Sequence, residues 1–264
     1  GPHESGLLKM LAIGLGKETG AARLHSYGIH GIRDLMPEVA QVVLDRARLL
    51  AGVATVEDGY HRPVRLQVLP PAAIIAGEQQ LLQLSRALTP RLPVDDIDVL
   101  IVDRLGKEIS GSGMDTNVIG RRRIAGEAEP ESPRVKALVV LDLSAASHGN
   151  ALGVGLADFT TRRLLEKIDF AVTGKNVFTS GFLDRGRLPL VFDTDVEAVD
   201  AAIRHVFRAH PQARGQARIV RIRDTLSLDE IWVTPNLLDE VRADPGFLAA
   251  GEPEELPGTD GSLL

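Results

Sequence analysis

The sequence predicts an α/β protein made of two parts, with parallel or mixed sheets and flanking helices. Residues 97–103 and 135–143 are nearly continuous apolar runs, which is typical of strands in a parallel sheet covered on both faces. Segments with helical periodicity, clearest over residues 32–50, accompany such runs along the chain. With 264 residues, of which 44% are hydrophobic, the chain can bury one large core or two modest ones.

A boundary between the two parts is expected at residues 91–96, where proline and a pair of aspartates interrupt the periodic patterns. We therefore expect one domain over residues 1–92 and a second over residues 95–250. Residues 251–264 are rich in proline and glycine and are expected to form a flexible tail.

In the first part, the pattern predicts two short helices, a longer helix with Pro37 near its start, a pair of strands and an amphipathic helix. In chain order these elements are expected at residues 5–13, 17–27, 32–50, 53–58, 64–69 and 77–88.

In the second part, strands are expected at residues 97–103, 135–143, 188–192, 217–222 and 230–233. Helices are expected over residues 152–163, from Thr194 or Asp195 to about His210, and over 235–242. Glu197 lies where a capping box at Thr194 needs it. Residues 175–181 are expected to form a polar loop.

Composition restricts the function. The net charge of −6 and the pI of about 5.7 do not suggest a nucleic acid or an anionic membrane as partner. The chain has no cysteine, which excludes disulfides, zinc–thiolate sites and a cysteine nucleophile. Since no apolar run reaches the roughly 18 residues of a membrane span and no secretory signal opens the chain, we expect a soluble, cytoplasmic protein.

The first thirty residues carry the first candidate site. Lys9 interrupts an apolar run, and His25 follows sixteen residues later, after a turn that contains Gly14 and Gly16. Burial in such a run would lower the pKa of Lys9 and make its amine a nucleophile, and the glycine turn could expose N–H groups to a phosphate. The alternatives are a Lys9 that extends to solvent, an ordinary half-buried histidine and a plain turn.

The second candidate site is a glycine-rich loop at residues 106–117, directly after a predicted buried strand. Open α/β sheets place ligands at the carboxyl ends of their strands, so the loop is expected to bind an anion or a cofactor. Lys107 is a candidate catalytic residue, and the expected ligand contacts are Ser110, Ser112, Asp115 and Asn117.

His148 and Asp158 follow the next predicted strand and are the acid–base candidates in this part of the chain. The alternative for Asp158 is that it only caps and orients a helix. The nearby run of three arginines at residues 121–123 is expected to be solvated, because acidic residues follow it.

The opening GPHESGLLKM, the GLGK that follows and a histidine sixteen residues after Lys9 resemble the nickel-pincer lactate racemase family. More narrowly, they resemble a branch of homologues known as predicted isomerases. The resemblance implies a two-domain lactate-racemase-like fold. It also implies that Lys9 carries a nickel-bearing, nicotinic-acid-derived mononucleotide through a thioamide bond, and that His25 is the protein ligand of the metal.

The implied activity is racemisation or epimerisation of a 2-hydroxy acid by hydride removal from C2 and hydride return. The implied partners are the substrate, cofactor-biosynthesis proteins and a second copy of the chain in a homodimer. Family members carry a glutamine and a catalytic lysine where this chain has Thr116 and Ile119, so we expect Lys107 to substitute. The resemblance further implies that the chain starts inside the catalytic domain, so that the chain alone is an incomplete enzyme. The alternative is a non-catalytic α/β module that binds a phosphorylated ligand.

Overall fold

The computed structural model describes residues 6–58, 62–124, 127–247 and 251–252. The chain forms two compact units, one mainly of residues 1–89 and one of most of residues 90–264. The domain limits expected from the sequence stay predictions, and most of the expected tail lies outside the described residues.

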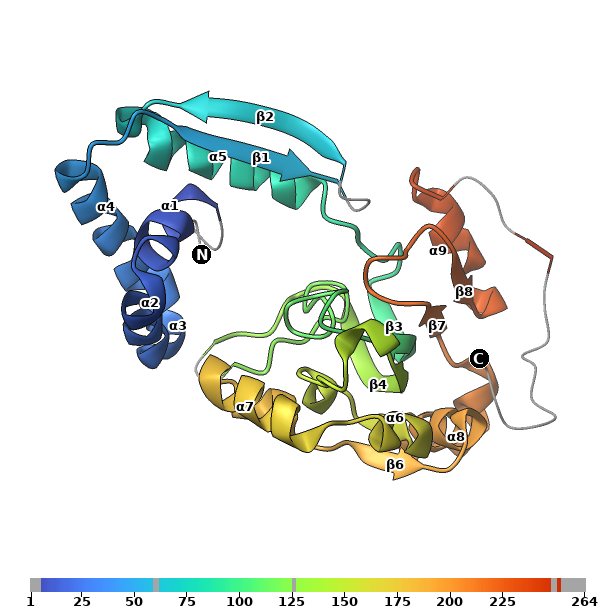
Figure 1. The fold of residues 1–264 in the computed structure, drawn as a ribbon. Coiled ribbons are helices and arrows are strands. Elements are labelled where there is room, and N and C mark those ends of the chain that lie inside the picture. Colours follow the sequence, from blue (N-terminus) through green and yellow to red (C-terminus); the bar gives the residue numbers. More distant parts are fainter. Residues whose placement is uncertain (1–5, 59–61, 125–126, 248–250, 253–264) are drawn as a thin grey trace. The chain divides into compact units, whose positions relative to one another are not determined.

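The first unit consists of short helices and a β-hairpin (Figure 1). In chain order it contains α1 (Leu7–Lys9) with a π-helical turn (Met10–Gly14), α2 (Lys17–Ser26), α3 (Gly28–His30), a second π-helical turn (Gly31–Leu35), α4 (Met36–Arg46), β1 (Gly52–Glu57), β2 (Pro63–Leu69), a 3-10 turn (Pro71–Ala73) and α5 (Ile74–Ala87). The predicted elements of this unit are therefore present, with shifted ends.

Two of these ends have a clear physical cause. Pro37 lies in the first turn of α4, where its missing N–H costs no hydrogen bond. The helix was expected to reach residue 50 but ends at Arg46, because Ala47 is extended and Leu50 is 96% exposed. Extending the helix to Leu50 would gain no burial of the Leu50 side chain.

The hairpin pairs β1 with β2 in antiparallel register, with Val53 opposite Val68. Helix α5 contacts β1 and fixes the unit's core through side chains such as Ile74 and Leu81. Gly77 on α5 lies close to β2, since a Cβ there would lie 2.6 Å from a Leu69 methyl group and Leu69 would have to shift.

The second unit contains a six-stranded sheet in the order β6-β5-β4-β3-β7-β8. All neighbours are parallel except β7 and β8. The strands are β3 (Asp96–Leu105), β4 (Arg134–Leu143), β5 (Phe159–Thr161), β6 (Leu190–Phe192), β7 (Ile219–Ile222) and β8 (Ile231–Val233). The predicted α/β class with a parallel or mixed sheet is confirmed (Figure 1).

Both faces of this sheet are covered. Helix α8 (Asp195–Val206) covers one face, where Ala198 and Ala202 pack on Ile101 and Val139. The opposite face is covered by loop segments whose apolar side chains are fully buried, among them Met114, Ile119, Ala151 and Leu156. The loop after β3 is therefore part of the core's cover.

The predicted helix over residues 152–163 is wrong. Residues 159–161 form strand β5, and α6 (Arg162–Glu166) follows it. The Thr160 and Thr161 hydroxyls donate to carbonyls of β4 at 2.8 and 2.6 Å. The Thr161 hydroxyl also caps α6 by accepting the Leu164 N–H. Buried β-branched residues fit a strand better than a helix.

The predicted polar loop over residues 175–181 is also wrong, because α7 (Phe170–Ser180) covers most of it. Asp169 accepts the N–H groups of Ala171 and Val172 at 2.9 Å, and Thr173 and Val177 are buried on one helix face. The capping box of Thr194 and Glu197 is confirmed, although α8 ends at Val206. Helix α9 (Leu238–Ala243) follows a 3-10 turn (Pro235–Leu237).

Candidate functional site

Lys9 ends α1 and His25 lies in the last turn of α2, so both belong to the first unit. Both residues are exposed, and neither side chain has a hydrogen bond or ion pair within the described part of the chain. The expected burial of Lys9 is therefore wrong: Leu8 and Leu11 fill the core, while Lys9 faces solvent. The amine and the imidazole are open to an external group.

The helix that carries Lys9 is held by α5. The Leu8 N–H donates to Glu78 Oε2 at 2.8 Å, and Glu78 is only 2% exposed. Gly6, with φ of 104°, brings the chain past this carboxylate. An N–H of the first helical turn is thus satisfied by a buried acidic side chain.

The two candidate glycines differ. A Cβ at Gly16 would lie 2.4 Å from the Ala12 carbonyl oxygen, so Gly16 is required where the chain turns into α2. Gly14 ends the π-helical turn and is exposed. The close approach explains Gly16 without a phosphate, and the cofactor role of both glycines stays a prediction.

Most backbone N–H groups of the loop at residues 106–117 donate hydrogen bonds to acceptors within the protein. Gly106 donates to the Gly113 carbonyl at 2.9 Å, and Asp115 donates to the Thr225 hydroxyl at 2.9 Å. The other N–H groups bound to protein acceptors are those of Lys107, Ile109, Ser110, Ser112, Gly113 and Asn117. The loop is therefore not an open backbone cradle for an anion.

The four expected ligand contacts of this loop bond to the loop and its neighbours. The Ser110 and Ser112 hydroxyls lie 3.4 Å apart, and Asp115 Oδ1 accepts the Asn117 N–H at 2.8 Å. Asn117 Oδ1 accepts a hydrogen bond from Arg122 at 3.3 Å. These contacts stabilise the loop, and a direct ligand role of the four residues stays a prediction.

Lys107 lies at the carboxyl end of the parallel sheet, next to the turn that carries His148. Its Nζ donates to the Gly111 carbonyl at 2.7 Å and to Asn176 Oδ1 at 3.4 Å. Burial, and then the charge of Arg185, lower the pKa of Lys107. It is an ammonium group without a carboxylate partner among the described residues.

His148 is exposed and left-handed, with φ of 49°, and it ends the 3-10 turn Ala145–Ser147. The Ser147 hydroxyl accepts the Lys107 N–H at 3.0 Å and donates to the Asn150 carbonyl at 2.6 Å. The structure thus brings the predicted residues Lys107 and His148 to the same edge of the sheet.

Asp158 has a different environment from the one expected of an acid–base residue. Its two oxygens bind Arg121 at 2.6 Å and Arg123 at 2.9 Å, and Oδ2 also accepts the Leu138 N–H at 2.9 Å. This favours the positioning alternative for Asp158. The expectation that the arginine run is solvated is wrong, because Arg121 is 11% exposed and also donates to three backbone carbonyls.

Sequence reasoning missed Arg185. It lies in the 3-10 turn Leu183–Gly186, is 8% exposed, and its Nε has no hydrogen-bond partner. Its guanidinium carbon lies 4.3 Å from the centre of the Phe182 ring. An arginine in a short polar segment gives no sequence signal of burial.

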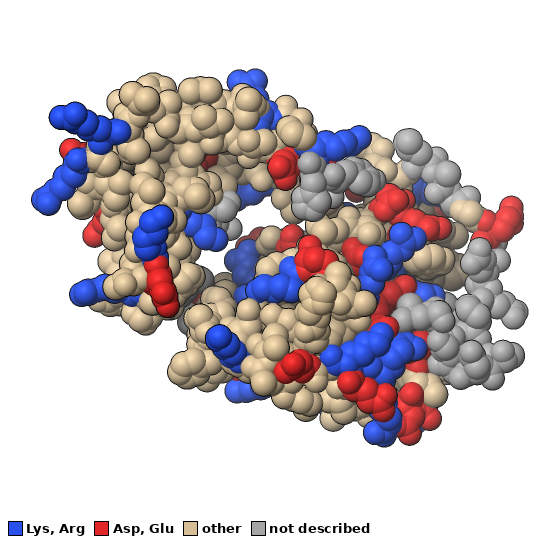
Figure 2. Space-filling model, in the orientation of Figure 1, with Lys and Arg blue, Asp and Glu red and all other residues tan. Residues whose placement is uncertain are grey.

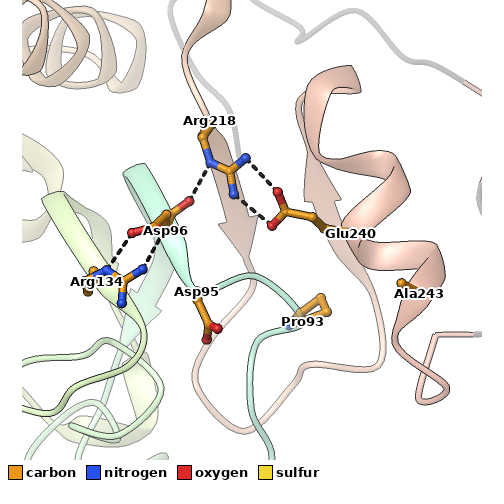
Figure 3. A pocket seen from close by; sticks show the side chains of 7 residues that line it. All are labelled: Pro93, Asp95, Asp96, Arg134, Arg218, Glu240 and Ala243. Atoms are coloured by element: carbon orange, nitrogen blue, oxygen red, sulfur yellow. Dashed lines mark hydrogen bonds and ion pairs between the residues drawn. The ribbon is translucent and has the colours of Figure 1, made fainter.

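A depression of about 590 Å³ lies at the opposite, amino edge of the sheet (Figure 3). Arg218 forms a double hydrogen bond with Glu240 at 2.8 Å, and Arg134 pairs with Asp96. These bonds lower the pKa of Glu240 and of Asp96 and raise the pKa of Arg218. These four charges satisfy one another, so this depression has no evident need of a ligand.

On the face drawn in Figure 2, acidic and basic side chains are intermixed over the sheet-bearing unit. Among the described residues, no helix is long and apolar enough to cross a membrane. In the same part of the chain, no three His, Asp or Glu side chains lie close enough together to hold a metal ion.

Comparisons with protein-family models, with curated proteins and with solved structures gave no match. The resemblance to the lactate racemase family therefore stays a prediction from the sequence.

Proposed function

We propose that this chain is a racemase or epimerase of 2-hydroxy acids that carries a nickel-pincer mononucleotide on Lys9. The observation that supports this most is that Lys9 and His25 are both exposed and both lie on helices of the first unit. Their spacing is the one that the resemblance requires, and no described residue competes for either group.

The donor set fits the implied group. The described residues offer no cluster of three metal ligands, which a bare nickel ion would need. A pincer brings its own donor atoms, so the chain has to supply one amine for the covalent bond and one imidazole nitrogen. Lys9 and His25 are free to do so, and the absence of cysteine is no obstacle.

When bound, the pyridinium ring of this group supplies a hydride acceptor. The chain's own contributions are a cation for the substrate carboxylate and a base for the hydroxyl proton. Within the second unit, Lys107 is the candidate cation, and the exposed imidazole of His148 is the candidate base. Asp158 is left out of the chemistry because arginines occupy its oxygens.

The test is co-expression with the cofactor-biosynthesis proteins, followed by intact-protein mass and nickel content. Wild type is compared with Lys9→Arg and with Lys17→Arg, a matched control that changes the other lysine of the first unit. We expect a mononucleotide-sized adduct with about one nickel in wild type and in the control, and neither in Lys9→Arg. His25→Gln should keep the adduct and lose nickel.

Activity is measured on the loaded protein by chiral separation of D- and L-2-hydroxy acids. Interconversion by wild type, lost in Lys9→Arg, supports the proposal. A folded wild type that gains no adduct under these conditions contradicts it.

A further inference from the structure

Arg185 is a buried cation that forms no ion pair with any residue that the structure describes. Its exposed fraction is 8%, and its Nε has no hydrogen-bond partner. Among the described residues, the one hydrogen bond of its guanidinium is a long one, from Nη2 to the Arg122 carbonyl at 3.5 Å. Burial lowers its pKa. A buried guanidinium normally has a carboxylate or several carbonyls around it, and its uncompensated desolvation costs stability.

The carboxylates near Arg185 are engaged elsewhere. Glu129 accepts the backbone N–H groups of Arg122 and Arg123. Asp184 pairs with Arg187 at 2.9 Å. Asp158, described above, is held by two other arginines. Among the described residues, none of these three acids forms an ion pair with Arg185.

The backbone packing places Arg185 beside the loop that carries Lys107. The Gly153 N–H donates to the Arg185 carbonyl at 2.9 Å, and a Cβ on Gly153 would lie 1.9 Å from the Ser112 carbonyl oxygen. Gly153 therefore contacts both segments at once. With φ of 103°, this position favours glycine for a second reason.

Helix α7 contacts both the Lys107 side chain and the turn that carries Arg185. Asn176 on this helix accepts a hydrogen bond from Lys107 Nζ at 3.4 Å. The next residue, Val177, lies against Gly186, where a Cβ would be 2.7 Å from a Val177 methyl carbon. The charge of Arg185 also lowers the pKa of Lys107, as expected for two cations near each other.

We propose that Arg185 and Lys107 form a binding site for an oxyanion, either a carboxylate or a phosphate. The guanidinium fork can bind two oxygens of such a group, and the ammonium adds a point charge. The bound anion would give Arg185 the ion-pair partner that it does not have among the described residues. The anion would be bound by these two side-chain cations and not by the backbone N–H groups of residues 106–117. The site does not depend on the nickel-bearing group.

The test uses the full chain without cofactor and two probes, inorganic phosphate and L-lactate. Binding is measured by isothermal titration calorimetry and by the shift in Tm. The variants are Arg185→Met and Arg187→Met. Arg187 is the matched control because it lies two residues after Arg185 and is exposed. Its substitution by Met changes the net charge by the same amount.

We expect wild type to bind one probe molecule per chain. Arg185→Met should weaken binding by about tenfold or more, the effect of losing charge-assisted hydrogen bonds, and Arg187→Met should bind like wild type. Without anion, the Tm of Arg185→Met should equal or exceed that of wild type, because an uncompensated buried charge is removed. With anion, only wild type and the control should gain Tm.

The probes separate the two ligand classes. Binding of phosphate alone indicates a phosphorylated ligand, and binding of lactate alone indicates a hydroxy acid. The proposal is overturned if folded wild type binds neither probe, or if both variants lose binding equally. It is also overturned if Arg185→Met binds the probe as tightly as wild type, since the Arg185 guanidinium would then not contact the anion.

Discussion

The Leu8 N–H, in the first turn of the helix that carries Lys9, donates to the buried carboxylate of Glu78 at 2.8 Å. Seventy positions of sequence separate the two residues. The orientation of Lys9 therefore depends on a residue of α5 that the motif itself does not contain.

Glu78→Ala should lower the free energy of unfolding by about 1–3 kcal/mol, because the Leu8 N–H is left buried without an acceptor. Glu78→Gln keeps an acceptor oxygen and should cost clearly less. Urea unfolding of the two variants checks this. Equal losses would mean that the carboxylate's charge, and not the hydrogen bond, holds α1.

Asp158→Ala should destabilise the chain by about 3 kcal/mol, since Arg121 would stay buried without its counter-ion. Burial already lowers the pKa of Arg121. Chemical denaturation measures the loss. If the variant is as stable as wild type but loses activity when loaded, Asp158 acts in proton transfer and the positioning role is wrong.

The charge network at the amino edge of the sheet predicts a pH effect. The hydrogen bonds from Arg218 lower the pKa of Glu240, so the folded value lies below the unfolded one. The contribution of the Arg218–Glu240 pair to the free energy of unfolding is present above the unfolded pKa of Glu240, and it is lost as the pH falls through the folded pKa. In Arg218→Gln the pKa of Glu240 should rise toward its ordinary value, as an NMR titration of the side-chain carboxyl would show. An unchanged pKa would exclude the pairing in solution.

The pair Lys107 and Arg185 predicts a second titration. Burial and the charge of Arg185 lower the pKa of Lys107, so Arg185→Gln should raise it by removing the repulsion. NMR of the lysine side chain measures the shift, with Arg187→Gln as control. A shift of equal size in both variants would show that the effect is one of net charge and not of proximity.

Strands β3 and β4 could be predicted because both of their faces are buried, and continuous apolar runs reflect this directly. The capping box of α8 could be predicted because it is local in sequence. Strand β5 could not, since its threonines become strand residues only through bonds to β4.

In the candidate site, too, some features could be predicted from the sequence and others depend on tertiary contacts. The spacing of Lys9 and His25 is visible in the sequence, and so are Lys107 and His148, which follow strands. The burial of Arg185 depends on close approaches at Gly153 and Gly186, and the engagement of Asp158 depends on two arginines more than thirty residues away. Such contacts are tertiary and leave no periodic pattern.

The most direct measurement of the central claim is tryptic peptide mapping of the chain after co-expression with the cofactor-biosynthesis proteins. A thioamide on Lys9 removes its charge, so trypsin should not cleave after Lys9. The account predicts a peptide that continues to Lys17, carries the mononucleotide mass and fragments with that mass on Lys9. Complete cleavage after Lys9 in folded protein, with no added mass on any lysine, would contradict it.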